Sequence, residues 1–281
     1  MFRMVDRYLS GRAAMVTGGA SGQGRAIALA LAARGADVAI GSYLASHGPV
    51  PRGQDSYFPA EQELKAVCKE IEAKGVRAIG LDLDVRSNES CDAFVAATER
   101  AFGKIDILIN SAGIAAEQPM VGHPDETWLN IIDTNLTGYY RTIKRCLPGM
   151  IERRWGRIVN IASTAANVGA KDNAAYCSSK AGILGLTRCV ALEGAPHGVT
   201  CNAINPGFVN TRMLRSTLKT MKARDGDTRS EEEMIAAIAQ TYPQKRIIEP
   251  EEIGNLAAFL CHDDAFGIAA EDITIAAGSL W

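Results

Sequence analysis

Short runs of aliphatic and β-branched residues alternate with longer stretches of helical periodicity through the first two hundred positions of the chain. The runs predict strands at 13–16, 37–40, 77–81, 105–109, 157–161 and 199–204. The stretches between them predict helices at 24–34, 60–74, 87–102, 127–153 and 175–192. This alternation is typical of a parallel sheet. Because the strands are nearly continuous apolar runs, helices should cover both faces, and we expect a doubly wound, Rossmann-like α/β fold.

Two segments break this rhythm. Residues 44–59 carry three prolines and two glycines after the second strand, so their turn chemistry predicts a loop insertion. Residues 208–246 form a long charged connection with a short helix expected at 231–240. Connections of this length in a compact domain are commonly lids or binding loops, so we expect a substrate lid at 208–246. A length of 281 residues suits one large domain, which we expect to span residues 1–281.

Composition narrows the partners and the compartment. A formal net charge of −2 offers no basic surface for nucleic acid or an anionic membrane, and no apolar run approaches a membrane span. The seven cysteines form no CxxC pair, and the charged positions among residues 1–10 do not fit a secretory leader, so we expect a cytoplasmic protein. The four histidines form no metal-binding cluster, so we expect no metal.

A glycine-rich turn follows the first strand and leads directly into the first helix, with the spacing Gly18-x3-Gly22-x-Gly24. Such a turn lets the backbone approach a pyrophosphate, whose charge meets free N–H groups at the helix N-terminus. A tight turn without a ligand is the structural alternative. The motif alone identifies neither the cofactor nor the reaction.

Further candidate catalytic and binding residues lie on one expected helix and directly after three other strands. Tyr176 and Lys180 are four apart on an expected helix and share a face, where an ammonium would favour the phenolate. Ser163 follows the strand at 157–161, although it could also be a helix cap. Residues 84–85 and 110–113 follow two other strands. Because carboxyl ends of parallel strands share one edge, we expect these residues to line a single crevice.

Together these pieces resemble the short-chain dehydrogenase/reductase family over nearly the whole chain. The resemblance implies that Tyr176 transfers the proton, that Ser163 binds the substrate oxygen, that Lys180 holds the nicotinamide ribose and lowers the pKa of Tyr176, and that Asn135 anchors a water-linked proton path. It implies adenine contact by Asp84, a ribose wall at 110–113 and a nicotinamide carboxamide site at 206–211. The full expected cofactor set is Gly18, Ser21, Gly22, Gln23, Gly24, Ser42, Asp84, Val85, Asn110, Ala112, Gly113, Tyr176, Lys180, Pro206, Gly207, Val209 and Thr211.

Two departures affect the cofactor. The second strand ends at Ser42, where relatives that prefer NAD carry an acidic residue, yet no Lys or Arg stands at Ser21 or beside Ser42 to meet a 2′-phosphate. We therefore expect NAD or NADP with a lean to NAD, although Arg52 in the insertion could supply the missing charge. Gln23, where an aliphatic residue is usual, and the insertion at 44–59 are similar to the carveol-dehydrogenase-like subgroup. That insertion either covers the adenosine half of the cofactor or is a tolerated surface loop.

The expected activity is interconversion of a small secondary alcohol and its ketone by a nicotinamide-dependent oxidoreductase. Two alternatives stay open: an isomerase or epimerase that returns the hydride to its substrate, and a noncatalytic nucleotide-sensing regulator. The residues do not choose among sugars, alicyclic alcohols and acyl thioesters as substrates. The resemblance also implies a homo-oligomer, a dimer or tetramer, packed through helices at 125–150 and 176–192.

Overall fold

A computed structural model describes residues 6–47 and 58–279 of the chain. Its sheet contains seven strands in the order β3-β2-β1-β4-β5-β6-β7. Every neighbouring pair is parallel, with registers such as Ala14 opposite Val38 in β2 and opposite Ile107 in β4. The strands are β1 (Ala13–Thr17), β2 (Asp37–Ser42), β3 (Ala78–Asp82), β4 (Ile107–Asn110), β5 (Gly156–Ile161), β6 (Val199–Pro206) and β7 (Asp272–Ile275).

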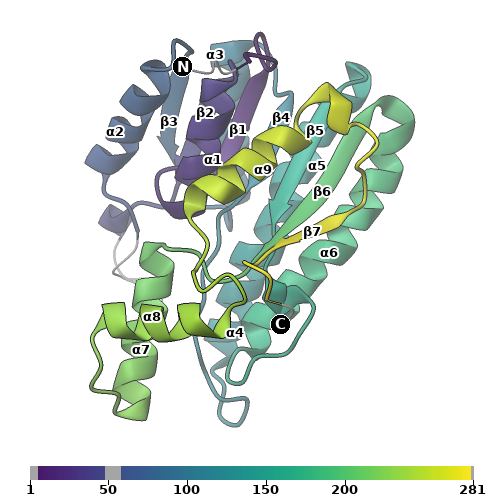
Figure 1. Ribbon diagram of the computed structural model, residues 1–281. Coiled ribbons are helices and arrows are strands. Elements are labelled where there is room, and N and C mark those ends of the chain that lie inside the picture. The colour runs from purple at the N-terminus through teal and green to yellow at the C-terminus, as the bar shows by residue number, and fades with distance from the viewer. Residues whose placement is uncertain (1–5, 48–57, 280–281) are drawn as a thin grey trace.

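Helices cover both faces of this sheet (Figure 1). Alternate strand residues face opposite ways, so Val16 of β1 joins the core beneath one helical layer while Met15 joins the core beneath the other. The first layer contains α1 (Gly22–Ala33), α2 (Glu61–Glu72) and α9 (Pro250–Leu260). The second contains α3 (Asn88–Phe102), α5 (Gly138–Glu152) and α6 (Ala174–Gly194). The doubly wound fold is confirmed.

The strand order reverses beside β1. The chain proceeds outward from β1 to β2 and β3, and then returns to place β4 on the other side of β1. In such a sheet the connections leave the carboxyl ends of β1 and β4 in opposite directions and leave a crevice between them, where ligands bind. The glycine-rich turn follows β1 and residues 111–113 follow β4, so both segments lie at this crevice.

Three parts of the chain differ from the sequence-based expectation. The helix expected at 127–153 is divided into α4 (Asp125–Ile132), a π-helical stretch η2 (Asp133–Thr137) and α5. The lid segment contains not only α8 (Glu231–Thr241), close to the expected helix, but also α7 (Arg212–Asp225). No element was assigned beyond residue 246, where the structure has α9 and β7. Short 3-10 turns lie at η1 (Ala45–His47), η3 (Thr164–Ala166), η4 (Ala195–His197) and η5 (Asp263–Ala265).

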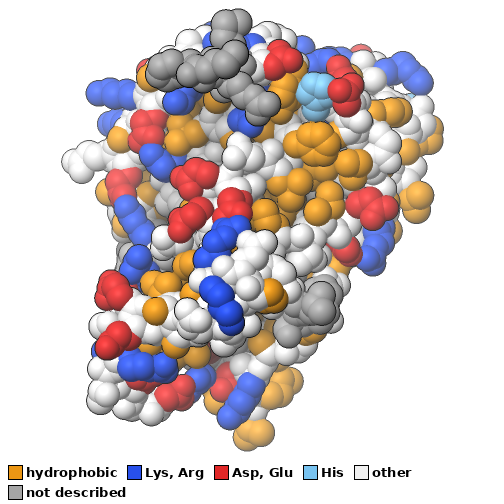
Figure 2. Space-filling view, in the orientation of Figure 1, with side chains coloured by type: hydrophobic (Ala, Val, Ile, Leu, Met, Phe, Trp, Pro, Cys, Tyr) orange, Lys and Arg blue, Asp and Glu red, His pale blue; other side chains and the backbone are white. Residues whose placement is uncertain are grey.

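The helices α7 and α8 stand apart from the two layers, at one end of the sheet (Figure 1). Thr211 caps α7, because its side chain accepts a hydrogen bond from Leu214 N, and Gly226 ends the helix with a positive φ of 65°. Arg215 and Lys219 of α7 form ion pairs with Glu231 of α8. Figure 2 shows acidic and basic side chains interleaved over this part of the surface. Leu214 and Leu218 of α7 and Met234 of α8 are buried, so the two helices have a small apolar inner side and a charged outer face.

Candidate active site

The glycine-rich turn is shaped so that only glycine fits at two of its positions. Gly18 has a positive φ of 69°, and a Cβ added there would lie 3.0 Å from the backbone of Ala112. A Cβ added to Gly24 would lie 2.2 Å from the carbonyl oxygen of Gly18. The turn therefore brings the N-terminus of α1 close to the end of β4. This tight cradle fits a pyrophosphate, as a dinucleotide site requires.

Hydroxyl groups fix the neighbouring strand ends to this turn. Thr17 Oγ1 accepts hydrogen bonds from the backbone N atoms of Ser111 and Ala112, both at 3.1 Å. Ser42 Oγ at the end of β2 accepts a hydrogen bond from Ala20 N at 3.0 Å. Because Ser42 is buried and already holds the turn, its first role in the structure is to position the glycine loop.

Tyr176 and Lys180 lie on α6 and both line the same pocket as the glycine turn. Ser163, which follows β5, caps the 3-10 turn η3 by accepting a hydrogen bond from Ala165 N at 3.1 Å. Its hydroxyl lies near the Tyr176 phenol and lowers the pKa of that phenol in part. The three side chains expected to act together therefore lie in one region, with Tyr176 and Lys180 at the pocket and Ser163 behind its lining.

Burial dominates the electrostatics of this group. Lys180 is 5% exposed, and burial lowers its pKa from 10.5 to about 7. Its Nζ donates a hydrogen bond to the carbonyl oxygen of Ile161 at 2.8 Å and lies 5.6 Å from the centre of the Tyr176 ring. Burial raises the pKa of Tyr176, while Ser163 lowers it in part.

Asn135 occupies the π-helical stretch η2, a local feature that is often found at functional sites. Its side chain pairs with the backbone of Ile114, accepting from Ile114 N at 2.8 Å and donating to Ile114 O at 2.9 Å. It also donates to Ser179 Oγ at 3.1 Å on α6. Asn135 thus joins the loop after β4 to the helix that carries Tyr176. It does not itself line the pocket.

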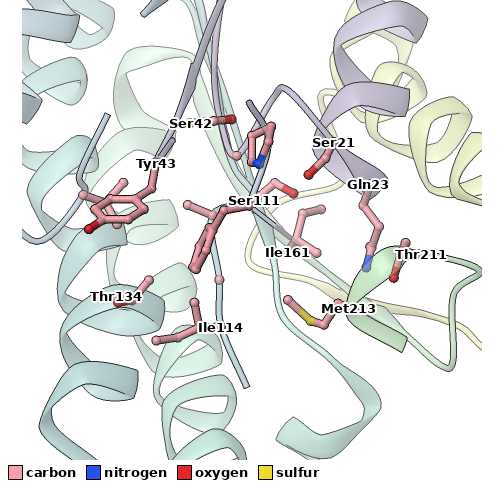
Figure 3. Close-up of a pocket in the computed structure, with 18 of the residues that line it drawn as sticks. Ser21, Gln23, Ser42, Tyr43, Ser111, Ile114, Thr134, Ile161, Thr211 and Met213 are labelled. Carbon is pink, nitrogen blue, oxygen red and sulfur yellow. The ribbon is translucent and has the colours of Figure 1, made fainter. Parts of the chain in front are cut away.

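Most of the expected cofactor residues gather at one pocket (Figure 3). Those that line it are Gly18, Ser21, Gly22, Gln23, Gly24, Ser42, Asp84, Val85, Ala112, Gly113, Tyr176, Lys180 and Thr211. Four others lie elsewhere. Asn110 faces the second helical layer, where it accepts from Thr142 Oγ1 at 2.6 Å and donates to Asn160 Oδ1 at 2.9 Å. Pro206 and Gly207 precede the segment 208–246, Val209 lies at its start, and within 206–211 only Thr211 lines the pocket.

Comparisons with known proteins agree with this geometry. A family model described as Enoyl-(Acyl carrier protein) reductase matches residues 55–279. The 3-oxoacyl-(acyl-carrier-protein) reductase FabG of Vibrio cholerae is 34% identical over 270 residues, which are 96% of this chain and 98% of that protein. The chain belongs to the short-chain dehydrogenase/reductase family. It is therefore an oxidoreductase of the NAD(P)-dependent kind.

Two solved structures of this family are similar along almost their whole length. A variant of the actinorhodin polyketide ketoreductase with NADPH is 35% identical, with a TM-score of 0.85, and the match covers 96% of this chain and 97% of that one. An NAD⁺-bound xylitol dehydrogenase is 30% identical, with a TM-score of 0.83, covering 96% and 99%. Because one relative holds NADPH and the other NAD⁺, the family includes both cofactors.

Several residues of this short-chain dehydrogenase/reductase pocket were not identified from the sequence. Tyr43, Phe58 and Arg86 line the end of the pocket beside Ser42 and Asp84, and Met213 lines it from α7. Phe58 closes the insertion, and its ring lies edge-on to Tyr43 with centroids 5.3 Å apart. Residues 48–57, including Arg52, lie outside the described residues. An aromatic residue just before a helix has many possible environments, so the sequence held no signal for this contact.

Arg86 and Asp84 form a closed pair at this end of the pocket. Arg86 donates through Nε and Nη2 to the two oxygens of Asp84, at 2.9 and 2.8 Å, and through Nη1 to Asn130 at 2.7 Å. Burial alone would raise the pKa of Asp84, but the hydrogen bonds from Arg86 lower it below its ordinary value. Arg86 also lies over the Tyr43 ring, 5.2 Å from its centre. Both charges are therefore balanced within the pocket wall.

An ion-pair cluster connects the lid with the loops beside the catalytic group. Arg224 of α7 lies 2.9 Å from Glu117 Oε2 and 3.3 Å from Asp172 Oδ2. Glu117 belongs to the loop after β4, and Asp172 lies four residues before Tyr176. Burial raises the pKa of Glu117, and Arg224 opposes that effect. The cluster thus joins α7 to the loop after β4 and to the segment that precedes α6.

The described residues contain neither a cluster of metal-binding side chains nor a membrane-spanning helix. Within 6–47 and 58–279, no three His, Cys, Asp or Glu side chains come close enough to hold a metal ion. Over the same ranges, no helix combines the length and apolar character needed to cross a bilayer.

Proposed function

We propose that this chain interconverts a small secondary alcohol and its ketone by reversible hydride transfer to and from a nicotinamide dinucleotide. The observation that carries the proposal is that Tyr176 and Lys180 line the same pocket as the glycine turn, with Ser163 near the Tyr176 phenol. A noncatalytic sensor would have no need for a buried proton-transfer group beside its nucleotide. The intact group therefore favours an enzyme.

Each side chain has a distinct task in this reaction. The dinucleotide, when bound, supplies or accepts the hydride. Ser163 holds the substrate oxygen, and Tyr176 gives that oxygen a proton as negative charge develops on it during reduction. Because burial raises the pKa of Tyr176, the phenol stays protonated near neutral pH. A protonated phenol is the form that reduction requires, while oxidation requires its loss of a proton.

Lys180 controls the surroundings of that proton. Its amine has one hydrogen bond to the Ile161 carbonyl and further N–H groups directed at the crevice that it lines. We expect it to bind the nicotinamide ribose and to gain charge when a bound pyrophosphate brings negative potential into the pocket. A charged Lys180 would then favour the phenolate during alcohol oxidation. Asn135 holds the loop after β4 in place for a water-linked proton path.

The charges of the pocket favour NAD over NADP. Among the described residues, the arginines that line the pocket are already paired, Arg86 with Asp84 and Arg212 with Glu63. A 2′-phosphate would have to compete with a carboxylate for either of them, and a phosphate without a cation is costly to bury. Titration with NADH and NADPH, followed by fluorescence, tests this preference. A clearly tighter NADPH complex would overturn it.

The lid and its ion-pair cluster support a small substrate. Arg224 of α7 is paired with Glu117 and Asp172, and we take these segments as the substrate entrance. Named relatives act on ketoacyl groups carried by a protein, on a polyketide or on xylitol. Two carboxylates at the entrance suit a neutral hydroxylated substrate better than a long anionic carrier arm, because like charges repel such an arm. We therefore rank polyols and small ketones above acyl thioesters.

The decisive experiment measures reduced nicotinamide by absorbance over a panel of alcohols and ketones with both cofactors. The panel should contain polyols, alicyclic alcohols and an acetoacetyl thioester. Turnover with release of free NADH supports the proposal. Substrate conversion without accumulation of reduced cofactor supports the isomerase alternative. Tight cofactor binding with no turnover over the whole panel supports the nucleotide-sensing regulator.

A further inference from the structure

One backbone carbonyl beside the proton-transfer residues holds two side-chain donors. The Ile161 carbonyl oxygen, at the end of β5, accepts a hydrogen bond from Lys180 Nζ at 2.8 Å and another from the Tyr139 hydroxyl at 3.1 Å. The last residue of β4 pairs with Asn160, so β5 extends one residue beyond it and side chains from α5 and α6 can reach this oxygen. A carbonyl oxygen has two lone pairs, and the two donors occupy both.

Tyr139 lies behind the catalytic group rather than in the pocket. It stands in the first turn of α5, directly after η2, and is 1% exposed in an apolar cluster with Ala162 and Ile183. It is not among the described residues that line the pocket. Its ring centre is 5.8 Å from Lys180 Nζ, close to the 5.6 Å that separates this nitrogen from the ring centre of Tyr176. Lys180 therefore has one phenol at the pocket and a second one in the core.

The groups that face the Lys180 amine are neutral. Tyr176 faces it from its own helix and Tyr139 from α5, while the loop after β4 approaches at Gly113, where an added Cβ would lie 3.7 Å from Nζ. Burial causes the lowered pKa of Lys180, and among the described residues no carboxylate or second cation contributes to it. The Ile161 carbonyl, at hydrogen-bond distance, is thus the group that favours the charged amine.

A second donor changes what this carbonyl offers to the amine. The Tyr139 O–H bond directs the positive end of its dipole at the same oxygen, so the oxygen is a poorer acceptor for an ammonium group. We infer that Tyr139 is a positioning residue of the proton-transfer group, whose hydroxyl shares the Ile161 carbonyl with Lys180 and limits how firmly the charged amine is held there. An amine held less firmly can turn to a bound ribose. The inference rests on the proposed function only for the binding of a dinucleotide beside Lys180.

The test follows binding of NADH to the full-length protein by fluorescence between about pH 6 and 9, or of NADPH if that binds more tightly. A charged amine favours the anionic dinucleotide, so the affinity of the wild type should fall as pH rises above the Lys180 pKa of about 7. Tyr139→Phe makes the Ile161 carbonyl a better acceptor. The pH at which affinity begins to fall should then rise by roughly 0.5 to 1 unit, the effect of one neutral hydrogen bond.

A change in the opposite direction provides a second measurement. Insertion of 3-fluorotyrosine at position 139 keeps the ring and the hydrogen bond but makes the hydroxyl a stronger donor. The pH at which affinity begins to fall should then decrease. This protein decides the question if a thermal melt shows that Tyr139→Phe is not folded, and the absence of a downward shift would count against the inference.

Two control variants separate this effect from packing. Tyr140→Phe removes the exposed hydroxyl of the next residue on α5 and should keep the wild-type pH dependence. Lys180→Met should bind more weakly and lose the fall in affinity, which identifies the amine as the titrating group. The inference is overturned if Tyr139→Phe changes affinity equally at every pH, or if the fall persists in Lys180→Met. Failure of the wild type to bind NADH or NADPH at any pH would instead refute the proposed function.

Discussion

Replacing Lys180 by methionine should make the folded protein more stable while it removes activity. Lys180 is a buried amine whose pKa falls from 10.5 to about 7 because the protein interior disfavours its charge. Methionine has a similar length and no charge. The stabilisation should depend on pH in a way that identifies the buried amine as its cause.

The expected gain in the free energy of unfolding follows from the lowered pKa of Lys180 and from the one hydrogen bond that the variant loses. Each tenfold change in a protonation equilibrium is worth about 1.4 kcal/mol, so the fall from 10.5 to about 7 corresponds to about 5 kcal/mol against folding below pH 7. The variant loses the bond from Lys180 Nζ to Ile161 O, worth about 1 kcal/mol. That carbonyl still accepts from the Tyr139 hydroxyl at 3.1 Å. We expect a net gain of roughly 2 to 4 kcal/mol below pH 7.

The sign of the pH dependence is specific. Below pH 7 the amine is protonated in both folded and unfolded chains, and the full penalty acts on the wild type. Between 7 and 10.5 the folded chain releases its proton while the unfolded chain keeps it, so wild-type stability rises with pH. The advantage of Lys180→Met should therefore be greatest below pH 7 and should disappear as pH approaches 10.5, where the lost hydrogen bond to Ile161 O leaves the variant slightly less stable than wild type.

Urea unfolding at about pH 6, 8 and 10, at one fixed protein concentration, measures this difference. The control is Lys144→Met on α5, the same substitution at an exposed lysine, which should not reproduce the stabilisation of the Lys180 variant. If Lys180→Met is less stable than wild type at every pH, or if its advantage does not vary with pH, the reasoning about the buried amine is refuted.

Three further substitutions test other parts of the site. Tyr176→Phe should lower turnover by roughly 10²- to 10⁴-fold, as for other positioned acid/base groups, while NADH binding by fluorescence is retained. Gly24→Ala should weaken cofactor binding by at least about tenfold in the same titration, because its Cβ would lie 2.2 Å from the Gly18 carbonyl oxygen. Arg224→Gln should raise KM for the substrate by roughly 2- to 5-fold in steady-state assays, because it releases the lid from the two carboxylates at the entrance.

Matched variants show what would contradict these expectations. Tyr140→Phe removes an exposed hydroxyl from α5, and a loss as large as that of the Tyr176 variant would show that the effect is not specific to the site. Gly185→Ala adds a methyl where no atom lies within 4 Å, so equal damage there would argue against steric exclusion at the turn. Arg229→Gln breaks a local pair with Asp227 on the lid, and an equal rise in KM would exclude a special role for Arg224.

Much of the site could be predicted because its residues are neighbours in sequence. The glycine spacing, the turn from strand to helix and the shared face of Tyr176 and Lys180 are properties of single segments. The lid helix α7 was not predicted, because its many charged residues resemble a loop. Its capping residue Thr211 and the glycine at its end were the available signals.

Asn110 illustrates a different limit. The sequence places it at the end of β4, but its side chain faces the second helical layer, where Thr142 and Asn160 hold it. Successive strand residues point to opposite faces, and both faces of this sheet are apolar. The pattern of residues therefore could not indicate which face Asn110 would occupy.

By itself, the sequence predicted the alternation of strands and helices through residue 204, the glycine-rich turn after the first strand and the shared helix face of Tyr176 and Lys180, because each depends on residues a few positions apart. Only the tertiary structure decided that Arg86 and Arg212 are neutralised by carboxylates, that Lys180 is buried deeply enough for its pKa to fall to about 7, and that Tyr139 shares the Ile161 carbonyl with it. Burial and charge pairing are set by side chains from distant segments, and no local pattern records which of them will meet.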